Sequence, residues 1–170
     1  MDTTPKYIKM CQKAYPIKEW KWKQGFDEGD FVFDGKKVRV VGHDFLQVHR
    51  YADRPWFRFA MREPLSTITF EQEFPDASVE AREGKYIVEV LGNPTWLPRQ
   101  DQLQEMVFDN TVGIQSRCCA IYEFSISVNG VKFCLDDGSS EQLWLAFVMH
   151  EKCGKVWDEG KEEWIALSKK

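Results

Sequence analysis

The chain has 170 residues, of which 43% are hydrophobic and 29% are charged, and its formal net charge is −4. This length is typical of one domain with a buried core, and the acidic balance argues against a protein that binds nucleic acid through net charge alone. No apolar run reaches the roughly 20 residues of a membrane-spanning helix, and the first residues lack the basic and apolar regions of a signal peptide. We therefore expect a cytoplasmic protein.

The N-terminal residues predict a short helix followed by an extended segment. Thr4 can cap the helix with its hydroxyl, and Pro5 suits the first helical position because its missing N–H costs nothing there. We expect this helix to stop at Pro16. After it, Trp20 and Trp22 alternate with charged residues, which predicts a strand or extended arm with both indoles on one face.

The next part of the chain is rich in strand signals. Residues 29–41 predict a hairpin around Asp34-Gly35, a pair typical of a type I′ turn. Residues 71–84 predict an acidic surface loop, with one helical turn over residues 76–82. Gly92-Asn93-Pro94 ends this region. Further strands are predicted over residues 45–51, 56–61, 65–70 and 86–91.

The C-terminal part mixes helices and hairpins. Residues 99–108 predict an amphipathic helix. Residues 122–128 alternate between apolar and polar side chains, and Asn129-Gly130 follows them, so we predict a hairpin that returns over residues 131–135. A final hairpin is predicted over residues 156–165.

A helix over residues 141–153 is predicted to be the centre of the core. Ser139 and Gln142 have the spacing of a capping box, and Gly154 can end the helix in the left-handed conformation. Between these signals lie the seven apolar residues 143–149. A helix that is apolar on every side is buried on several sides, so this element predicts a central buried helix.

Taken together, these elements predict an α+β fold, in which antiparallel sheets pack with about three helices. We expect a single domain over residues 1–170. A soft division separates a β-rich half, residues 1–92, from an α+β half, residues 93–170.

Few residues are arranged for catalysis. His150 and Cys153 lie three positions apart near the end of the central helix, so contact between them is possible, but a histidine favoured by the helix C-terminus explains the same pattern. The five cysteines form no C-x-x-C pair, which favours reduced thiols. No phosphate-binding loop or hydrolase elbow is present. We predict no catalytic residue, no cofactor and no enzyme activity, although an enzyme with dispersed carboxylates leaves no local motif.

Two patterns raise the question of a metal. His43 and His49 lie near acidic residues, but on a strand they would be roughly 20 Å apart. Residues 136–139 resemble a fragment of a calcium loop but lack its alternating ligands and closing glutamate. We predict no metal site.

Binding surfaces are the more promising candidates. Basic residues interleave with aromatic ones in two places, which can serve nucleic-acid binding or simply be the exposed side of a strand. These residues are Lys18, Lys21 and Lys23 with Trp20 and Trp22, and Arg50, Arg54, Arg58 and Arg62 around Trp56 and Phe57. Clusters of acidic residues can dock on a basic protein groove or be an ordinary solvated face. The predicted partner-binding residues are Trp20, Trp22, Asp27, Glu28, Asp30, Trp56, Glu71 and Glu73.

Several segments also resemble a known family. The segments are Tyr7-Ile-Lys-Met-Cys11, Trp96-Leu-Pro-Arg-Gln-Asp-Gln-Leu-Gln-Glu-Met106, Leu143-Trp-Leu-Ala-Phe-Val-Met-His-Glu-Lys152 and Lys155-Val-Trp157-Asp. They resemble a family of small uncharacterised proteins encoded by phages and prophages of Firmicutes, and the resemblance does not extend to residues 26–92. It implies a phage setting, in which small accessory proteins commonly bind a host or defence protein; anti-CRISPR proteins are one such class.

The leading hypothesis is therefore a non-enzymatic phage or prophage protein in the host cytoplasm. It would act as an inhibitor that occludes a host or defence-system protein or ribonucleoprotein, as anti-CRISPR proteins do. The first alternative is an accessory protein of phage replication or packaging that contacts nucleic acid. The second is a hydrolase or nuclease with dispersed carboxylates.

Overall fold

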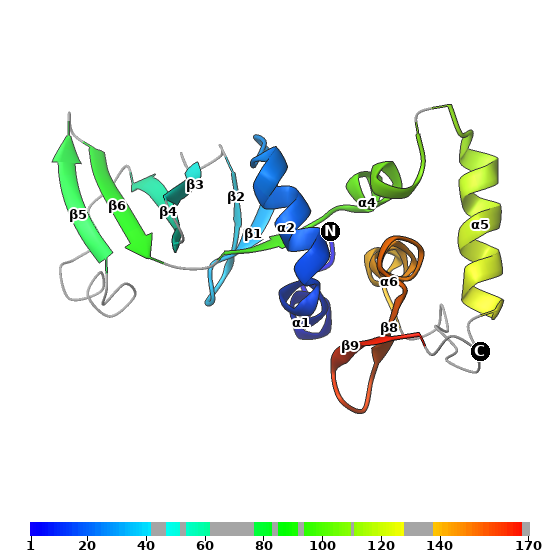
Figure 1. The fold of residues 1–170 in the computed structure, drawn as a ribbon. Helices are drawn as coiled ribbons and strands as arrows, with labels where there is room; N and C mark the ends of the chain where they lie inside the picture. The colour runs from blue at the N-terminus through cyan, green and yellow to red at the C-terminus, as the bar shows by residue number, and fades with distance from the viewer. Residues whose placement is uncertain are drawn as a thin grey trace. The chain divides into compact units, whose positions relative to one another are not determined.

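A computed structural model describes the chain over residues 1–41, 47–51, 54–61, 77–82, 85–91, 94–109, 111–127 and 138–167. Within these ranges the chain forms five helices and nine strands, and the strands pair into three antiparallel sheets (Figure 1). The predicted α+β class is confirmed, with more helices than the three or so expected.

The chain divides into two compact units. Unit 1 combines Met1–Lys18 with Pro98–Lys170, and unit 2 is Glu19–Leu97. The predicted soft division after residue 92 lies close to the end of unit 2, but the first helix belongs with the C-terminal unit.

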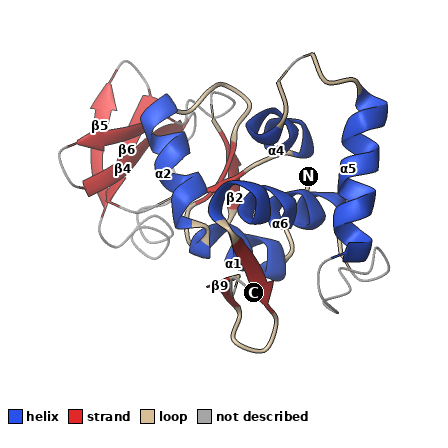
Figure 2. Cartoon of the chain, turned by 45° about the vertical axis from the view of Figure 1, so that its right-hand side comes forward, coloured by secondary structure: helices blue, strands red, loops and turns tan. Residues whose placement is uncertain are grey.

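Unit 1 is built around helix α6, as predicted. Helix α6 lies among three other helices and contacts the hairpin that follows it (Figure 2). The elements of unit 1 are α1 (Pro5–Lys13), α4 (Gln100–Val107), α5 (Ile114–Ser127), α6 (Ser140–Cys153), β8 (Lys155–Asp158) and β9 (Glu163–Ala166).

The predicted C-terminal cap of α6 and the Ser139 half of the predicted capping box are both observed. The Ser139 hydroxyl accepts a hydrogen bond from the Gln142 N–H at 3.1 Å. Gly154 adopts a left-handed φ of 59° and donates its N–H to the carbonyl oxygen of His150. These caps satisfy backbone groups that a helix end otherwise leaves unpaired.

The apolar run of α6 forms the core of unit 1. Leu145, Val148 and Met149 are completely buried. The ring of Phe147 lies 6.0 Å from that of Phe108 and 5.2 Å from that of Phe124. Burial of each such side chain stabilises the folded state by about 1.5–3 kcal/mol, so the apolar run of α6 contributes strongly to the stability of this unit.

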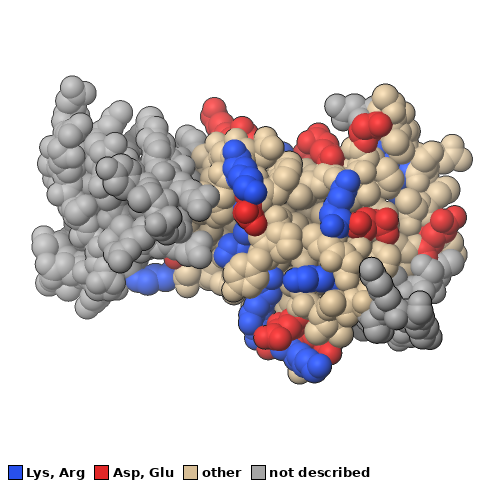
Figure 3. Space-filling model, in the orientation of Figure 1, with Lys and Arg blue, Asp and Glu red and all other residues tan. Residues whose placement is uncertain are grey.

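Helix α1 packs between α6 and the C-terminal hairpin, which confirms both predicted elements. The indole of Trp164 donates to the carbonyl oxygen of Met10 at 2.9 Å, and the Trp157 and Trp164 rings meet edge to face at 5.1 Å. Three ion pairs join the exposed side of α1 to the hairpin, where acidic and basic side chains alternate (Figure 3). The pairs are Lys6–Glu159, Lys9–Glu162 and Lys13–Glu163.

Helix α5 corrects the strand predicted over residues 122–128. Its outer and inner residues differ: Phe124 is buried and packs against α6, whereas Tyr122 is exposed. A short alternating run is also compatible with a helix. Residues two positions apart lie on nearly opposite sides of a helix, so the apolar residues of such a run are divided between its inner and outer sides. Contact with α6 selects the helix. The predicted hairpin return, residues 131–135, lies outside the described residues.

Helix α2 (Tyr15–Gln24) corrects the predicted extended arm, and its first residues belong to unit 1. The first helix ends at Lys13, before Pro16, as predicted. Pro16 itself occupies the first turn of the second helix, where proline is tolerated. Because Trp20 and Trp22 are two positions apart on a helix, they lie on different faces rather than one.

A small sheet in unit 2 pairs β1 (Phe31–Phe33) with β2 (Val38–Val40) and with β7 (Thr95–Leu97), the last of which we did not predict. The hairpin over residues 29–41 is confirmed, but its turn spans four residues instead of two. Within the turn, Asp34 accepts the N–H groups of Lys36 and Lys37, each at 2.8 Å, and this local bonding takes the place of a type I′ turn.

The second sheet of unit 2 has four strands in the order β3-β4-β6-β5. The strands are β3 (Gln47–Tyr51), β4 (Arg54–Met61), β5 (Ala77–Arg82) and β6 (Lys85–Leu91). Three of them confirm predicted strands. Strand β5 replaces the helical turn predicted over residues 76–82, because pairing with β6 provides backbone partners that a single turn lacks. The strand predicted over residues 65–70 lies outside the described residues.

Candidate functional site

The two tryptophans predicted to bind a partner contact different aromatic residues within unit 2. Trp20 is 42% exposed and stacks on Trp96, with the ring centroids 6.0 Å apart. Trp22 is half-buried and meets Phe26 edge to face at 4.9 Å. The two indoles therefore do not form one surface, and Trp20 is the more accessible of the two.

The acidic residues predicted to bind a partner differ in their exposure to solvent. Asp27 and Glu28 are exposed, but Asp30 is only 1% exposed. Asp30 pairs with the buried Lys21 at 2.7 Å and accepts the backbone N–H of Asp27 at 2.8 Å. We correct its role from partner contact to structural ion pair. Of the remaining candidates, Trp56 lies in β4, while Glu71 and Glu73 lie outside the described residues.

The buried Lys21 is held by both charge and aromatic rings. Its ammonium lies 5.1 Å from the ring centroid of Trp96 and 5.7 Å from that of Phe26. The Trp96 indole also donates to Asp30 at 3.4 Å. This cluster ties α2 to the three-stranded sheet inside unit 2. Lys21 is therefore part of the core of that unit and not of an open basic stripe.

The possible histidine–cysteine pair is not arranged to activate the thiol. The Nδ1 atom of His150 lies 2.7 Å from the Glu151 carboxylate, and its ring packs on Phe124. Burial raises the pKa of Cys153, which opposes formation of the nucleophilic thiolate.

The described residues also contain no group of three His, Cys, Asp or Glu side chains that could hold a metal ion. His49 lies in β3, whereas His43 and residues 136–137 of the calcium-like fragment fall outside the described ranges. Separately, no helix in the described part of the chain is long and apolar enough to span a membrane.

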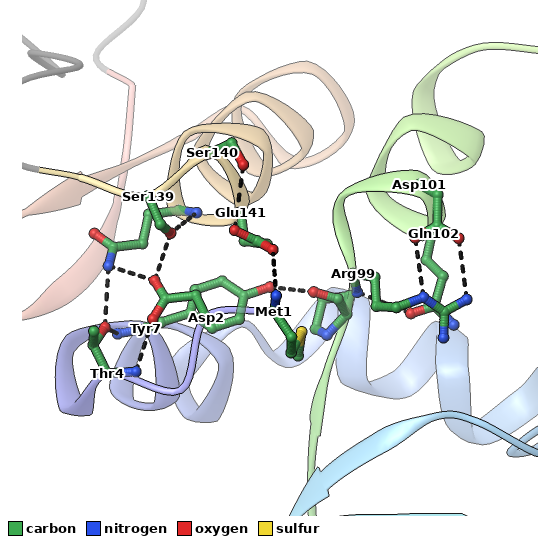
Figure 4. A network of polar contacts seen from close by, with 12 residues as sticks. Met1, Asp2, Thr4, Tyr7, Arg99, Asp101, Gln102, Ser139, Ser140 and Glu141 are labelled. Atoms are coloured by element: carbon green, nitrogen blue, oxygen red, sulfur yellow. Dashed lines mark hydrogen bonds and ion pairs between the residues drawn. The ribbon is translucent and has the colours of Figure 1, made fainter.

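A network of polar contacts lies at the start of α6 (Figure 4). The buried carboxylate of Asp2 accepts from Ser139 at 2.5 Å, from the side-chain amide of Gln142 at 2.7 Å and from the N–H of Thr4 at 2.7 Å. Burial acts to raise the pKa of Asp2, but these hydrogen bonds outweigh it and leave the pKa below its ordinary value. The carboxylate therefore joins the N-terminal segment to α6 and complements the positive end of that helix.

A surface that the sequence analysis missed lies on α5. Ile114, Cys118 and Tyr122 are four positions apart, so they form one stripe along the helix. Ile114 is 77% exposed, Tyr122 is 62% exposed, and Cys118 is an exposed free thiol. We call these three residues the α5 stripe. Their spacing is visible in the sequence, but it has meaning only once residues 114–127 are known to be helical.

The pairing of the four-stranded sheet shows which of its residues share a face. Residues directly opposed in an antiparallel ladder share a face, and faces alternate along each strand. The register therefore sorts the residues of this sheet into two sets. The first set, which we call the charged face, is Gln47, His49, Tyr51, Arg54, Trp56, Arg58, Ala60, Ser78, Glu80, Arg82, Lys85, Ile87, Glu89 and Leu91. The second set, the apolar face, is Val48, Arg50, Pro55, Phe57, Phe59, Met61, Ala77, Val79, Ala81, Tyr86, Val88 and Val90.

This division splits the basic and aromatic residues that the sequence grouped together. Arg54, Trp56 and Arg58 lie on the charged face, whereas Arg50 and Phe57 lie on the apolar face. Arg62 is outside the described residues.

Comparison of the chain with family models, with curated proteins and with solved structures gave no match.

Proposed function

We propose that this chain is a non-enzymatic binding protein that occludes a partner protein, and that the α5 stripe is the surface through which it docks. The observation that supports this proposal best is the exposure of Ile114 and Tyr122 on the outer side of a helix whose inner side is already packed. A surface helix ordinarily turns polar residues outward. Grouped apolar residues on a surface are typical of an interaction site.

The neighbouring Arg117 does not cover the stripe. Arg117, the basic residue next to it, donates to the carbonyl oxygens of Val112 and Asp109 at 2.9 and 3.1 Å. Its guanidinium also lies 5.9 Å from the ring centroid of Phe108. Arg117 is thus held by contacts at the start of α5, and the stripe stays accessible.

The spacing of the stripe indicates the kind of partner. A helix binds an apolar groove of another protein through apolar anchors that recur every three or four positions along one face. Tyr122 adds a phenol that can hydrogen-bond at the edge of such a groove, and tyrosine is enriched at interfaces for this reason. The proposed partner is therefore a protein with an apolar groove.

The biological setting is proposed from the family resemblance. A small phage or prophage protein that binds in this way would occlude a host or defence-system protein or ribonucleoprotein in the host cytoplasm, as anti-CRISPR proteins do. Nucleic-acid contact by the partner, or by this chain, is compatible with that setting.

The test is affinity capture from a nuclease-treated Firmicute lysate that contains defence systems, with the wild-type chain and two α5 variants. Tyr122→Asp places a charge in the stripe and should weaken retention of the partner by about 30-fold or more, as loss of an interface hot spot does. Glu123→Gln changes an exposed neighbour outside the stripe and should retain the same protein as the wild type. Equal retention by both variants would exclude the stripe as the docking surface, and no retained protein at all would exclude the binding function.

A further inference from the structure

The α5 stripe is arranged symmetrically about an exposed thiol. Ile114 lies four positions before Cys118 and Tyr122 lies four positions after it, so each is just over one helical turn away. Two copies of this helix that lie antiparallel about a two-fold axis at Cys118 would bring the two thiols together. The same arrangement places each Ile114 opposite the Tyr122 of the other copy. Contacts between two copies ordinarily have this symmetry, in which both copies use the same patch.

The charge of α5 favours a second copy as the occupant of the stripe. Two copies of a chain with net charge −4 repel each other, so they approach most easily over an uncharged patch. With 3.6 residues per turn, the charged residues of α5, Arg117 and Glu123, lie about 100° and 140° around the helix from Cys118. The residues within about 60° of Cys118 that complete this side of α5 are uncharged. They are Gln115, Ile121 and Ser125.

The distance between facing residues of two packed helices suits a disulfide. Helix axes pack about 8–10 Å apart, and Cα atoms lie about 2.3 Å from their axis. Two facing Cα atoms are therefore roughly 3.5–5.5 Å apart, which overlaps the range of about 4.4–6.8 Å in disulfides. Cys119 is the other exposed thiol of α5, but neighbouring Cα atoms are only about 3.8 Å apart. Cys118 is therefore better placed to bond with a second copy than with Cys119.

The contact area indicates that a covalent bond is needed. The stripe contributes three side chains from each copy, which is much less than the roughly 1,200 Å² of a stable protein interface. Contact alone should therefore leave the reduced protein monomeric, with its stripe exposed. A disulfide at the centre of the stripe would hold the two copies together.

We propose that a second copy of this chain covers the α5 stripe under oxidising conditions, in an antiparallel pair of α5 helices joined by a disulfide between the two Cys118 residues. The oxidant is a small disulfide such as oxidised glutathione. The thiolate of one Cys118 attacks it, forms a mixed disulfide and releases one small thiolate. The Cys118 thiolate of the second copy then attacks the Cys118 sulfur of the mixed disulfide and releases the other.

This exchange is balanced without a further reactant. Two protein thiols each lose a proton and are oxidised to one disulfide, while the small disulfide is reduced to two thiols that take up the two protons. The dimer hides the stripe that the reduced protein presents to its partner, so oxidation should switch partner binding off. That consequence rests on the proposed function, whereas the dimer itself does not.

Oxidation of the purified full chain tests the dimer. With oxidised glutathione, light scattering on a size-exclusion column should show the wild type passing from the monomer mass to twice that mass, and dithiothreitol should restore the monomer. Cys118→Ser should stay monomeric. Cys119→Ser is the matched control, because it removes an adjacent thiol that is also exposed, and it should dimerise as the wild type does. A wild type that stays monomeric, a Cys118→Ser chain that dimerises, or equal losses from the two variants would overturn the proposal.

Charge substitutions test the antiparallel arrangement. Ile114→Glu and Tyr122→Lys change exposed side chains, so both should leave folding intact. In an antiparallel pair the double variant places each new Glu opposite a new Lys, so it should dimerise faster than either single variant. A double variant slower than both would show a parallel pair, in which like charges meet, and would overturn the arrangement.

Lysate capture with the oxidised dimer, compared with the same chain after dithiothreitol, tests the effect on partner binding. The dimer should retain much less of the partner, and equal retention would contradict a hidden stripe. Capture by the reduced chain does not depend on the dimer. Failure of the dimer is therefore distinguishable from failure of the proposed function.

Discussion

At the scale of single residues, the Lys21–Asp30 pair shows how charge is used inside unit 2. Lys21 is 4% exposed and Asp30 is 1% exposed, so both charges have lost nearly all of their water. Such a burial is tolerated when the charges pair and their remaining hydrogen-bonding groups are satisfied. The Trp96 indole and the Asp27 backbone N–H also donate to the Asp30 carboxylate.

Asp30→Asn should therefore lower the free energy of unfolding by about 3–5 kcal/mol, because it leaves the buried Lys21 without its main counter-charge. Urea denaturation followed by tryptophan fluorescence measures this change. Asp27→Asn is the control: Asp27 also pairs with Lys21, but its side chain is 84% exposed, and its loss should cost about 0–1 kcal/mol. Comparable losses from the two variants would contradict a buried ion pair.

The Asp2 carboxylate makes the stability of unit 1 depend on pH in the acid range. Because the folded pKa of Asp2 lies below its ordinary value, its carboxylate stabilises the fold fully above the unfolded pKa, about 3.9. That contribution is lost as the pH falls from there through the lower folded pKa. Asp2→Asn should cost about 1–3 kcal/mol at neutral pH and should reduce the decrease in melting temperature between pH 5 and pH 2.

The control for this pH dependence is Asp101→Asn. A hydrogen bond from Arg99 lowers the pKa of Asp101 as well, but that ion pair is largely exposed and contributes little to stability. Melting curves recorded across the acid range should therefore separate the two variants. Parallel pH profiles for Asp2→Asn and the wild type would show that the Asp2 network is not linked to folding.

At the scale of elements, helices and hairpins were predictable when their caps, turns and apolar residues lie within one short stretch of the sequence. The Ser139 cap, the apolar run and Gly154 lie within one stretch of sequence, so α6 could be predicted with both of its ends. The C-terminal hairpin and the helix α4 were predictable for the same reason. Gln142 is a partial exception: its side chain reaches Asp2 and Thr4 rather than completing the capping box with Ser139.

Gly154 offers a test of this local chemistry. Its φ of 59° is easily adopted by glycine and is tolerated by asparagine, but it is strained for alanine. Gly154→Ala should lower the free energy of unfolding by about 1 kcal/mol, whereas Gly154→Asn should cost less. Chemical denaturation of both variants checks the order. If alanine were tolerated as well as asparagine, the left-handed cap would not be contributing to stability.

Elements decided by tertiary contact were not predictable from local pattern. Residues 15–24 and 114–127 both contain short alternating runs, yet both are helices. In residues 15–24, Lys21 forms an ion pair with Asp30, which lies nine positions further along the chain. In residues 114–127, Phe124 packs against Phe147. A pattern of period two cannot reveal contacts with residues so far away, so the two strand predictions were wrong.

At the scale of the whole molecule, the predicted and the observed candidate surfaces lie in different units. The partner-binding set predicted from the sequence concentrated on residues 20–73, in unit 2, and its residues turned out to be dispersed, buried or outside the described ranges. The α5 stripe belongs to unit 1, in a segment for which a strand was predicted. The charged face depends on the register of four strands, which places together residues up to 42 positions apart, Gln47 and Glu89, on either side of Arg58.

The central claim is that a partner protein covers the α5 stripe, and the reactivity of Cys118 tests it most directly. Because Cys118 is an exposed free thiol within the stripe, an alkylating reagent should modify it readily in the isolated protein. Cys153 is half-buried at the C-terminal end of α6, outside the stripe, and has a raised pKa. It therefore serves as an internal reference. We predict that alkylation of Cys118, followed by peptide mass spectrometry, is much slower in the captured complex while that of Cys153 is unchanged. If Cys118 reacts at the same rate alone and in the complex, the partner does not cover the stripe.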